Sequence, residues 1–477
     1  MRFSEYYKLN RTQPYLDFVD IPLHTDVAVF LDPTSIKLLD SVWGNELSSL
    51  LQTFFDVVLR LIKEGNNDKA IKLLSSLNES NEFHLGYSTG ESRGHGFGKL
   101  SAETVWNALT KSKAAKTGLL KDLEDTVLLI PGIGTDMISD AVCNILRGPL
   151  IKYTQDMCLF YNIPLTPDTF SGPIWNPIKE KWESELVPLP VTDRGMVILI
   201  PKILVRHNIR YQYDNYYRHY LLPEMQNEHL LANSPLVETL KNKNRRVTKK
   251  DLMAKYGTDK LSIIRETIKR PKVLEEFRRE VMSSTSLPLT HKDFSEVEGT
   301  ERPNLKALIT NLKNLSTGKE KAIEYEDIIE KILSVILYPS LCNPKKQYDL
   351  HDRRKRVDIT YTNEAKNGFF SWLSQHYPCP LIFIECKNYG KDIANPEIDQ
   401  LSGRFSPSRG KVGLLICREI KNKKLMYKRC IDTAKDRRGF ILVLDDNDIE
   451  LLVNEYIETN GTQDFPLLRE LWNSLIN

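Results

Sequence analysis

The most constraining feature of the chain is an apolar run, Leu381–Ile384, that ends on Glu385, Cys386 and Lys387. Four consecutive large apolar residues predict a buried β-strand. Because side chains alternate between the two faces of a strand, Glu385 and Lys387 point to one side and Cys386 to the other. An acid and a lysine held together at the end of such a strand suit two tasks. They can hold a hard divalent cation through oxygen and place an amine beside a metal-bound water.

A second acid, Asp358, lies in the strand-like run Val357–Tyr361. The pattern Asp…Glu-x-Lys resembles the active site of the PD-(D/E)xK, or restriction-endonuclease-like, nuclease superfamily, over roughly the last third of the chain. By that resemblance Asp358, Glu385 and the backbone carbonyl of Cys386 bind Mg²⁺ or Mn²⁺. Lys387 then orients or activates the attacking water, with a pKa expected to be lowered. Val357 stands where the family name has proline. The alternative interpretation is a strand-end salt bridge.

The order of elements around these residues is similar to the αβββαβ core of that superfamily. We expect an α/β fold with a restriction-endonuclease-like C-terminal core and a larger mixed, helix-rich N-terminal region. The periodicity predicts helices over 326–336, 365–377 and 395–404, a basic helix ending at 438, and strands over 346–350, 357–361, 381–387, 412–417 and 440–444.

The resemblance implies three further residues near the site. Glu326, which follows an aromatic residue in the first helix, is expected to supply one more acid, with Glu330 as the alternative. Gln400 and Arg404 lie four apart on one helical face, so both could reach the site. We assign Gln400 a catalytic role and Arg404 a nucleic-acid contact. A solvated helix face is the alternative for these two.

Length and composition bound the possibilities. A chain of 477 residues predicts two or three domains. We divide it into an N-terminal recognition or regulatory region (1–240), a basic helical segment with a linker (241–318) and the nuclease domain (319–477). The seven cysteines include no CxxC pair, which argues against zinc and disulfide frameworks. No signal peptide or membrane span is recognisable, so we expect a cytoplasmic protein without a membrane partner.

Local clusters of positive charge predict contacts with nucleic acid, since the formal net charge is only +3. Arg245 and Arg246 lie in a basic run over 241–279. Lys423 and Lys424 open the late basic helix. Aromatic and basic residues alternate over 205–222. There we assign Arg210 to a phosphate contact and Tyr217 to stacking on a base. Solvated charge and packed tyrosines are the alternatives.

The N-terminal region shows weaker patterns. It predicts strands over 27–31, 127–130 and 196–200, and helices over 36–63 and 68–77. Pro131–Gly134 partly resembles the turn of a helix-hairpin-helix module, which binds DNA phosphate, but we favour a plain structural turn. The glycine-rich stretch 86–99 lacks the spacing of a Walker A motif. Residues 283–304 are polar and aperiodic and predict the boundary before the nuclease unit.

The leading hypothesis is a metal-dependent endonuclease that hydrolyses phosphodiester bonds in DNA, of the restriction or anti-phage defence type. RNA is the alternative substrate. A hypothesis from a different class is a nucleic-acid-binding or partner-binding protein with a non-catalytic nuclease core. An enzyme in the N-terminal region has no support from HExxH, Walker A or GxSxG motifs. Expected partners are DNA and either a second copy of the chain or a defence-system protein.

Overall fold

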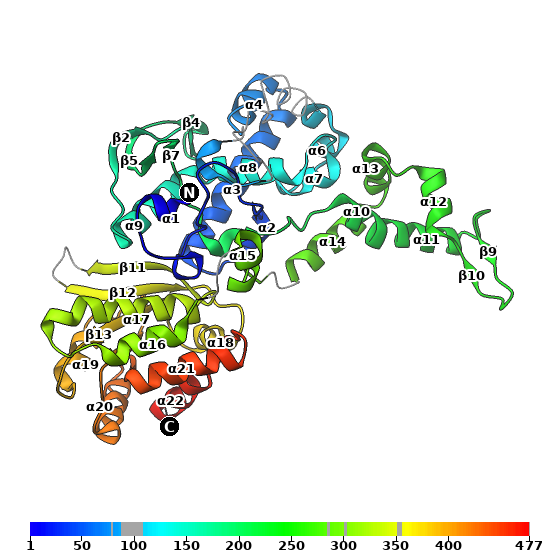
Figure 1. The fold of residues 1–477 in the computed structure, drawn as a ribbon. Helices are drawn as coiled ribbons and strands as arrows, with labels where there is room; N and C mark the ends of the chain where they lie inside the picture. Colours follow the sequence, from blue (N-terminus) through cyan, green and yellow to red (C-terminus); the bar gives the residue numbers. More distant parts are fainter. Residues whose placement is uncertain (78–79, 87–107, 284–286, 300–302, 351–354, 477) are drawn as a thin grey trace.

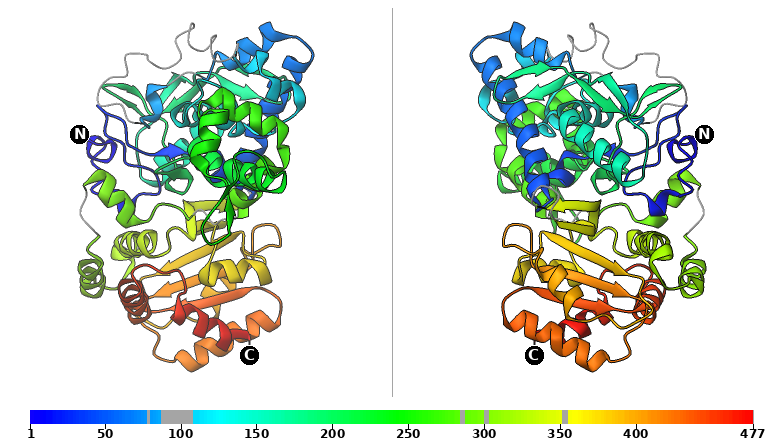
Figure 2. Two further views of the ribbon diagram at one scale, coloured as in Figure 1. Left: turned by 90° about the vertical axis from the view of Figure 1, so that its right-hand side faces the viewer. Right: turned by 90° about the vertical axis from the view of Figure 1, so that its left-hand side faces the viewer.

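The computed structural model describes residues 1–477 except 78–79, 87–107, 284–286, 300–302, 351–354 and 477. The chain forms a head region (residues 1–212), a projecting arm (213–283) and a sheet unit (305–477), as Figure 1 shows. The two side views in Figure 2 show the head region above the sheet unit. Within the described residues, no helix has the length and apolarity required to cross a membrane.

The sheet unit is built on five strands in the order β11-β12-β13-β14-β15. Its elements are α16 (Leu305–Asn314), η5 (Lys319–Lys321), α17 (Ala322–Ile336), β11 (Leu341–Leu350), β12 (Lys355–Asn363), α18 (Gly368–His376), β13 (Leu381–Lys387), α19 (Asn395–Ser402), β14 (Val412–Cys417), α20 (Lys423–Lys435), β15 (Phe440–Leu444), α21 (Asp446–Glu458) and α22 (Pro466–Ile476). The strands from β11 to β13 pair antiparallel, whereas β13, β14 and β15 run parallel. The sheet is therefore mixed.

Helices cover both faces of this sheet. The crossovers through α19 and α20 join parallel neighbours in the same direction, and right-handed crossovers place both helices on one face. The opposite face is covered by α17 and α21, with α16 packed against them. Since β13 to β15 are covered on both sides, their apolar residues are almost fully buried. The five strands and the mixed α/β class agree with the expectation.

The head region consists mostly of helices with short two-stranded ribbons. Its elements are α1 (Phe3–Tyr6), η1 (Gln13–Tyr15), β1 (Phe30–Leu31), α2 (Pro33–Lys37), α3 (Val42–Lys63), α4 (Asn67–Leu74), η2 (Asn81–Phe83), α6 (Lys113–Thr117), α7 (Asp125–Leu129), α8 (Thr135–Ile145), α9 (Arg147–Phe160), β2 (Thr166–Phe170), β3 (Ile174–Asn176), β4 (Lys181–Glu183), β5 (Leu186–Leu189), β6 (Val191–Thr192), β7 (Gly195–Met196), η3 (Lys202–Leu204) and β8 (Val205–Arg206). Long α3 supplies much of the buried core.

Several expectations for the head region were wrong. Residues 127–129 belong to helix α7 and Ile130 follows its end, because a short apolar run is ambiguous between a strand and a buried helical turn. The helix expected over 36–63 is split, since the Ser41 side chain caps a new helix by accepting from the Gly44 amide at 2.9 Å. Residues 197–200 are buried but outside any named strand. Only Phe30 and Leu31 of the first expected strand are in a ladder. Residues 87–99 of the glycine-rich stretch lie outside the described residues.

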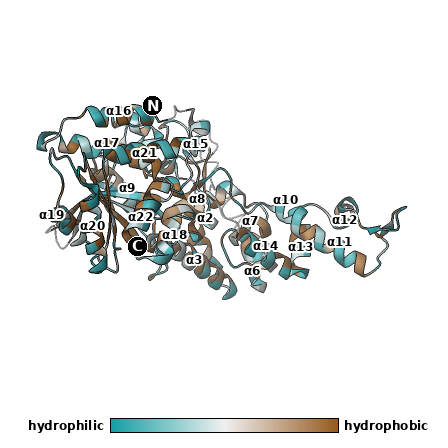
Figure 3. Cartoon of the chain, turned by 90° about the horizontal axis from the view of Figure 1, so that it is seen from below, coloured by the Kyte–Doolittle hydropathy of each residue, from teal (hydrophilic) through white to brown (hydrophobic). Residues whose placement is uncertain are grey.

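The arm is a helical projection that ends in a small hairpin. It comprises α10 (Tyr213–Tyr216), the π-helical turn η4 (Tyr217–Leu221), α11 (Leu222–Leu231), β9 (Glu238–Thr239), β10 (Arg245–Arg246), α12 (Lys249–Tyr256), α13 (Lys260–Lys269) and α14 (Pro271–Ser283). Figures 1 and 3, which view the chain from perpendicular directions, both show the arm extending away from the other two parts. The expected division at residue 240 therefore falls inside one structural element.

The segment expected to be a linker is largely structured. Helix α15 (His291–Glu298) lies within 283–304, and Thr290 caps it by accepting from the Asp293 amide at 3.2 Å. Phe294 and Leu289 are buried. The next helix, α16, packs on α17 and α21 and belongs to the sheet unit. Polar composition concealed α15, because buried Phe294 is surrounded in the sequence by polar residues.

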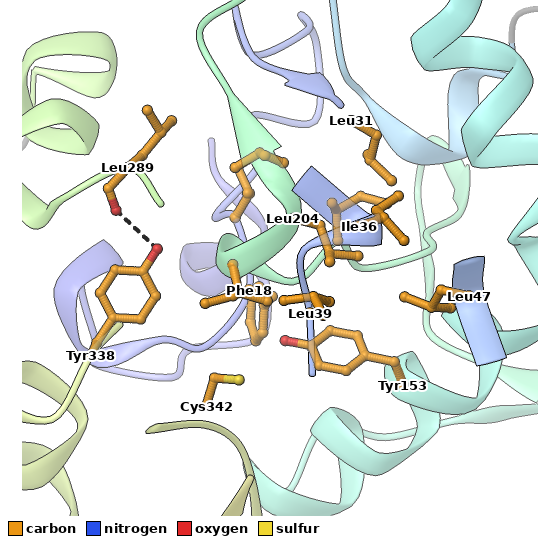
Figure 4. Packing of buried hydrophobic residues seen from close by; sticks show 14 of the residues in the cluster. Phe18, Leu31, Ile36, Leu39, Leu47, Tyr153, Leu204, Leu289, Tyr338 and Cys342 are labelled. Carbon is orange, nitrogen blue, oxygen red and sulfur yellow. Dashed lines mark hydrogen bonds between the residues drawn. The ribbon is translucent and has the colours of Figure 1, made fainter. Parts of the chain in front are cut away.

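The head region and the sheet unit share one buried junction. Figure 4 shows Phe18 and Tyr153 of the head packed in the same region as Tyr338 and Cys342 of the sheet unit. Asp17 crosses the junction, because its Oδ1 accepts from the Asn343 amide at 3.1 Å and its Oδ2 accepts from the Tyr153 hydroxyl at 2.8 Å. Helix α9 also packs on the edge strand β11. A covered edge cannot pair with another chain, which protects the sheet.

Candidate active site

Strand register brings the two predicted metal-binding acids together. Ile359 of β12 pairs with Ile384 of β13, so one further step places Asp358 opposite Glu385. Residues opposite each other in an antiparallel pair point to the same face. The last hydrogen bond between the two strands involves a side chain, because Asp358 Oδ2 accepts from the Cys386 amide at 2.8 Å. The acids therefore lie at the end of the β12–β13 ladder and at the carboxyl end of parallel β13.

Glu385 is surrounded by donors. Its side chain is 1% exposed. Its Oε1 accepts from Lys387 Nζ at 2.7 Å and from Gln400 Nε2 at 2.9 Å. Its Oε2 accepts from Arg404 Nη1 at 2.9 Å. The strand end and helix α19 thus bring the predicted Glu385, Lys387 and Gln400 into one cluster with Arg404.

The acids beside Lys387 favour its protonated form. Burial disfavours its ammonium, but the carboxylates of Glu385 and Asp358 outweigh that effect and raise the Lys387 pKa above its ordinary value. The expected lowering assumed a bound cation beside a partly desolvated Lys387, and for that state it stays a prediction. Lys387 is therefore a charged donor in this arrangement and not a free base.

Glu326 of α17 completes the cluster of acids. It is half-buried and forms no hydrogen bond or ion pair with the described residues. Burial and the nearby charges of Asp358 and Glu385 raise its pKa to about 7. Burial and Glu385 likewise raise the pKa of Asp358 to about 6. Oδ1 of Asp358 accepts no hydrogen bond from the described residues, so both acids keep oxygens available for a cation.

The alternative acid, Glu330, does not serve this site. It is fully buried, and its two oxygens accept from Arg11 of the head region at 3.0 and 2.5 Å. Ser334 donates to the same carboxylate at 2.8 Å. The residue before Glu326 also has a fixed role, because the Tyr325 hydroxyl donates to Asp446 Oδ1 at 2.9 Å. Glu326 itself lies near enough to Asp358 and Glu385 for their charges to act on its carboxyl.

Arg404 lies inside the site and not on an exposed surface. It is 6% exposed, and its guanidinium binds Glu385. A direct contact between Arg404 and nucleic acid would require breaking this buried pair. The prediction that it reaches the site agrees with the structure, but its position favours holding Glu385 over binding a phosphate.

The two lysines of the late basic helix differ in their surroundings. Lys423 Nζ lies 2.8 Å from Asp448 Oδ1 and 3.1 Å from Asp445 Oδ2, so its charge is neutralised within the sheet unit. Lys424 is exposed. Both follow β14 and lie near the carboxyl ends of the parallel strands. Of the two predicted nucleic-acid contacts, only Lys424 has a charge available to solvent.

The predicted contacts at 205–246 belong to the base and tip of the arm. Tyr217 is buried, and its hydroxyl donates to the Gly257 carbonyl at 2.6 Å, so its ring packs inside the arm and cannot stack on a base. Arg210 donates to the Val281 carbonyl at 2.7 Å. Arg245 and Arg246 are exposed in β10, but Arg245 binds Asn233 at 2.7 Å and Arg246 binds Glu238 at 3.2 Å. All four residues have structural partners.

The donor chemistry of the site fits a divalent cation only in part. Across the described residues, no group of three or more His, Cys, Asp or Glu side chains forms a ready metal site. Glu326 and Asp358 offer hard oxygen ligands in an acidic, half-buried setting, which suits Mg²⁺ or Mn²⁺. Glu385 fits less well, since three donors occupy its oxygens. Among the described residues, Oε2 accepts only from Arg404 and keeps one lone pair, so coordination by Glu385 would use Oε2 or would require Lys387 or Gln400 to release Oε1.

The family match found for this chain lies in the head region and not in the sheet unit. Residues 8–212 match the model of a family described as a domain of unknown function (DUF8370). The match includes Arg11 and Asp17, which contact the sheet unit, and ends where the arm begins. Searches with the chain against curated proteins and solved structures gave no match.

Proposed function

We propose that the chain is a metal-dependent nuclease that hydrolyses phosphodiester bonds in DNA, with its active site at the carboxyl end of β13. One observation carries this proposal. Three carboxylates, Glu326, Asp358 and Glu385, converge from a helix and two strands beside Lys387, and Glu326 has no partner among the described residues. Burial and mutual repulsion raise the pKa values of Glu326 and Asp358 although positive side chains are near, and a bound cation would relieve that cost.

The residues divide the work by their chemistry. Glu326 and Asp358, with Glu385 and the Cys386 carbonyl, would hold Mg²⁺ or Mn²⁺. Such an ion, when bound, supplies Lewis-acid stabilisation of the phosphate and a more acidic water. Lys387 stays protonated and can donate to a phosphate oxygen or to the attacking water. Gln400 and Arg404 orient Glu385 through the hydrogen bonds described above.

A second candidate is a binding protein that uses this fold without catalysis. The observation that favours it is the saturation of Glu385, because a carboxylate held by Lys387, Gln400 and Arg404 is already a stable buried network. The nuclease proposal explains one feature that this candidate leaves without a role, namely the unpaired carboxyl of Glu326. We therefore favour the nuclease. A role in restriction or anti-phage defence is part of the same proposal.

A cleavage panel separates the two candidates. Supercoiled plasmid, linear duplex, single-stranded DNA and RNA are each incubated with Mg²⁺, Mn²⁺ or EDTA. We expect metal-dependent cleavage of DNA that is lost in Asp358→Asn and Lys387→Met. The matched control is Lys37→Met, which removes another half-buried lysine paired with a buried acid, Glu124, at 2.6 Å. If no substrate is cut while all proteins bind DNA equally, the binding candidate replaces the nuclease.

A further inference from the structure

The arm carries an excess of positive charge that the rest of the chain lacks. Residues 213–283 include 15 Lys and Arg against 10 Asp and Glu, whereas the whole chain has a formal charge of only +3. The remainder of the protein is therefore net negative. Figures 1 and 3 show the arm projecting freely. A basic projection on an acidic body concentrates attraction for polyanions in one place.

Ion pairs along the arm neutralise some of its positive residues. Arg270 binds Glu228 at 2.5 Å and Glu266 at 2.7 Å. Arg278 binds Glu275 at 2.9 Å and also pairs with Asp125 of α7 in the head region. Arg270 and Arg278 are thus neutralised, whereas Lys272 and Arg279 of α14 are exposed and form no ion pair with the described residues. The densest positive run is 241–250, which holds six Lys and Arg and no Asp or Glu.

The hairpin and the start of α12 carry lysines that form no ion pair within the described part of the chain. Lys241, Lys243 and Lys250 are exposed and form no ion pair with the described residues. The neighbouring Arg245 and Arg246 are used differently, since they bind Asn233 and Glu238 and brace the hairpin. We call these three lysines, two in the hairpin turn and one at the start of α12, the tip lysines; they are the exposed lysines of the run 241–250.

The arm is packed well enough to hold the tip lysines in place. Tyr216, Tyr217 and Phe277 are buried inside it, and the Tyr216 hydroxyl donates to Thr267 at 3.1 Å. Gln226 donates to the Val247 carbonyl at 2.5 Å and ties α11 to the strand that leaves the hairpin. A pre-organised surface loses less entropy on binding than a flexible one.

We propose that the tip lysines form a phosphate-backbone contact for duplex DNA, separate from the candidate active site. This inference rests on the proposed function, because the active site gives the chain a reason to hold DNA. Anionic lipid is the competing polyanion, but no large apolar side chain is exposed between residues 238 and 250, and binding in a membrane interface needs an apolar face. Contacts of this kind are independent of base sequence.

The test measures binding without cleavage. The full chain and the triple variant Lys241→Glu, Lys243→Glu, Lys250→Glu are titrated with a fluorescent 30-base-pair duplex in EDTA at several salt concentrations. We expect at least a tenfold loss of affinity in the variant. The slope of log affinity against log salt should shrink by about 2 to 3, since each phosphate contact contributes about 0.9. Thermal unfolding checks that the exposed substitutions leave the fold intact.

The matched control applies the same charge change elsewhere. Lys63, Lys69 and Lys72 are exposed on α3 and α4 of the head region, and we expect their triple change to glutamate to leave the salt slope unaltered. Equal losses in both triple variants, or no loss in either, would overturn the inference. If the tip-lysine variant loses binding to phosphatidylserine vesicles but binds DNA as the wild type does, the inference is overturned in favour of lipid. If the tip-lysine variant loses DNA binding but the wild type cleaves no substrate, the nuclease proposal alone is contradicted.

Discussion

Arg11 and Glu330, which are 319 positions apart in the sequence, form a buried bidentate ion pair between the head region and helix α17. Their side chains are 7% and 0% exposed. Burial alone would lower the Arg11 pKa, but the Glu330 carboxylate outweighs that effect and raises it. The same helix holds Glu326 one turn earlier. The head region therefore contacts the element that carries one acid of the candidate site.

Replacing Arg11 with Met should destabilise the protein by about 3 to 5 kcal/mol, because it leaves Glu330 buried without a counter-charge. Urea unfolding measures the difference. The double variant Arg11→Met, Glu330→Met should recover most of the loss, since two apolar side chains replace the pair. Arg246→Met provides the control, because its ion pair with Glu238 is exposed and surface pairs contribute about 0–1 kcal/mol. Equal losses for Arg11 and Arg246 would contradict the prediction.

The sheet unit should not fold stably alone. A fragment of residues 305–477 lacks Arg11, the α9 cover on β11, and the head residues packed around Tyr338 and Cys342. It would expose a strand edge and an apolar surface together. We expect aggregation or the absence of a cooperative thermal transition, measured by circular dichroism on the purified fragment. A sharp transition comparable to that of the full chain would show that the head region is dispensable for folding.

The sequence predicted the sheet unit better than the head region for a physical reason. The boundaries of β13, β14 and β15 matched because these strands are covered on both faces and appear as unbroken apolar runs. In the head region, by contrast, the strands are two to five residues long and leave little periodic pattern. The apolar run 127–130, of which 127–129 lie in α7, was assigned to a strand, because so short a run does not distinguish the two periods.

The sequence predicted those residues of the candidate site that lie close together in the chain, but not their burial or their distant partners. Glu385 and Lys387 are two residues apart, and Gln400 lies in the helix that follows; that helix was expected to reach 404 but ends at Ser402, so Arg404 lies just beyond it. The buried position of Arg404 was not predictable, because exposure depends on how α19 packs against the sheet. Arg11 carried no signal at all, since its partner lies in another part of the chain and an isolated arginine near the N-terminus has no distinctive pattern.

Arg404→Gln should lower stability and leave DNA binding intact. The guanidinium is buried against Glu385, so its loss leaves that carboxylate with Lys387 and Gln400 only. We expect a destabilisation of about 3 kcal/mol in urea unfolding. DNA affinity in EDTA should stay within twofold of the wild type. A large loss of affinity with normal stability would restore the original assignment of Arg404 as a nucleic-acid contact.

Tyr217→Phe should likewise act on stability alone. The substitution keeps the buried ring and removes one hydrogen bond to the Gly257 carbonyl, which leaves that carbonyl unsatisfied. The expected cost is about 1 to 2 kcal/mol. Duplex and single-stranded DNA should bind as tightly as before, measured by anisotropy. The exposed Tyr213, changed to Phe, is the control and should affect neither quantity.

His291 should make the stability of the protein depend on pH between about 3 and 6.5. Its Nε2 lies 3.1 Å from the Val335 carbonyl and so carries the proton, while buried Nδ1 has no hydrogen-bond partner in the described part of the chain. Burial, followed by the charge of Lys202, lowers its pKa from the ordinary 6.5 to about 3. The unfolded chain binds a proton at this position below pH 6.5 and the folded chain does not. The contribution of neutral His291 to the free energy of unfolding is therefore fully present above pH 6.5 and is lost as the pH drops toward 3.

The size of this effect follows from the shift, at about 1.4 kcal/mol for each pH unit, or about 2 kcal/mol between pH 6.5 and 5. Other groups also titrate in this range, so the measurement is a difference between two proteins. His291→Gln keeps a donor for the Val335 carbonyl but cannot titrate. Its unfolding free energy should fall less steeply than that of the wild type as the pH is lowered. Parallel curves for the two proteins would show that His291 is protonated equally in both states, against the burial observed here.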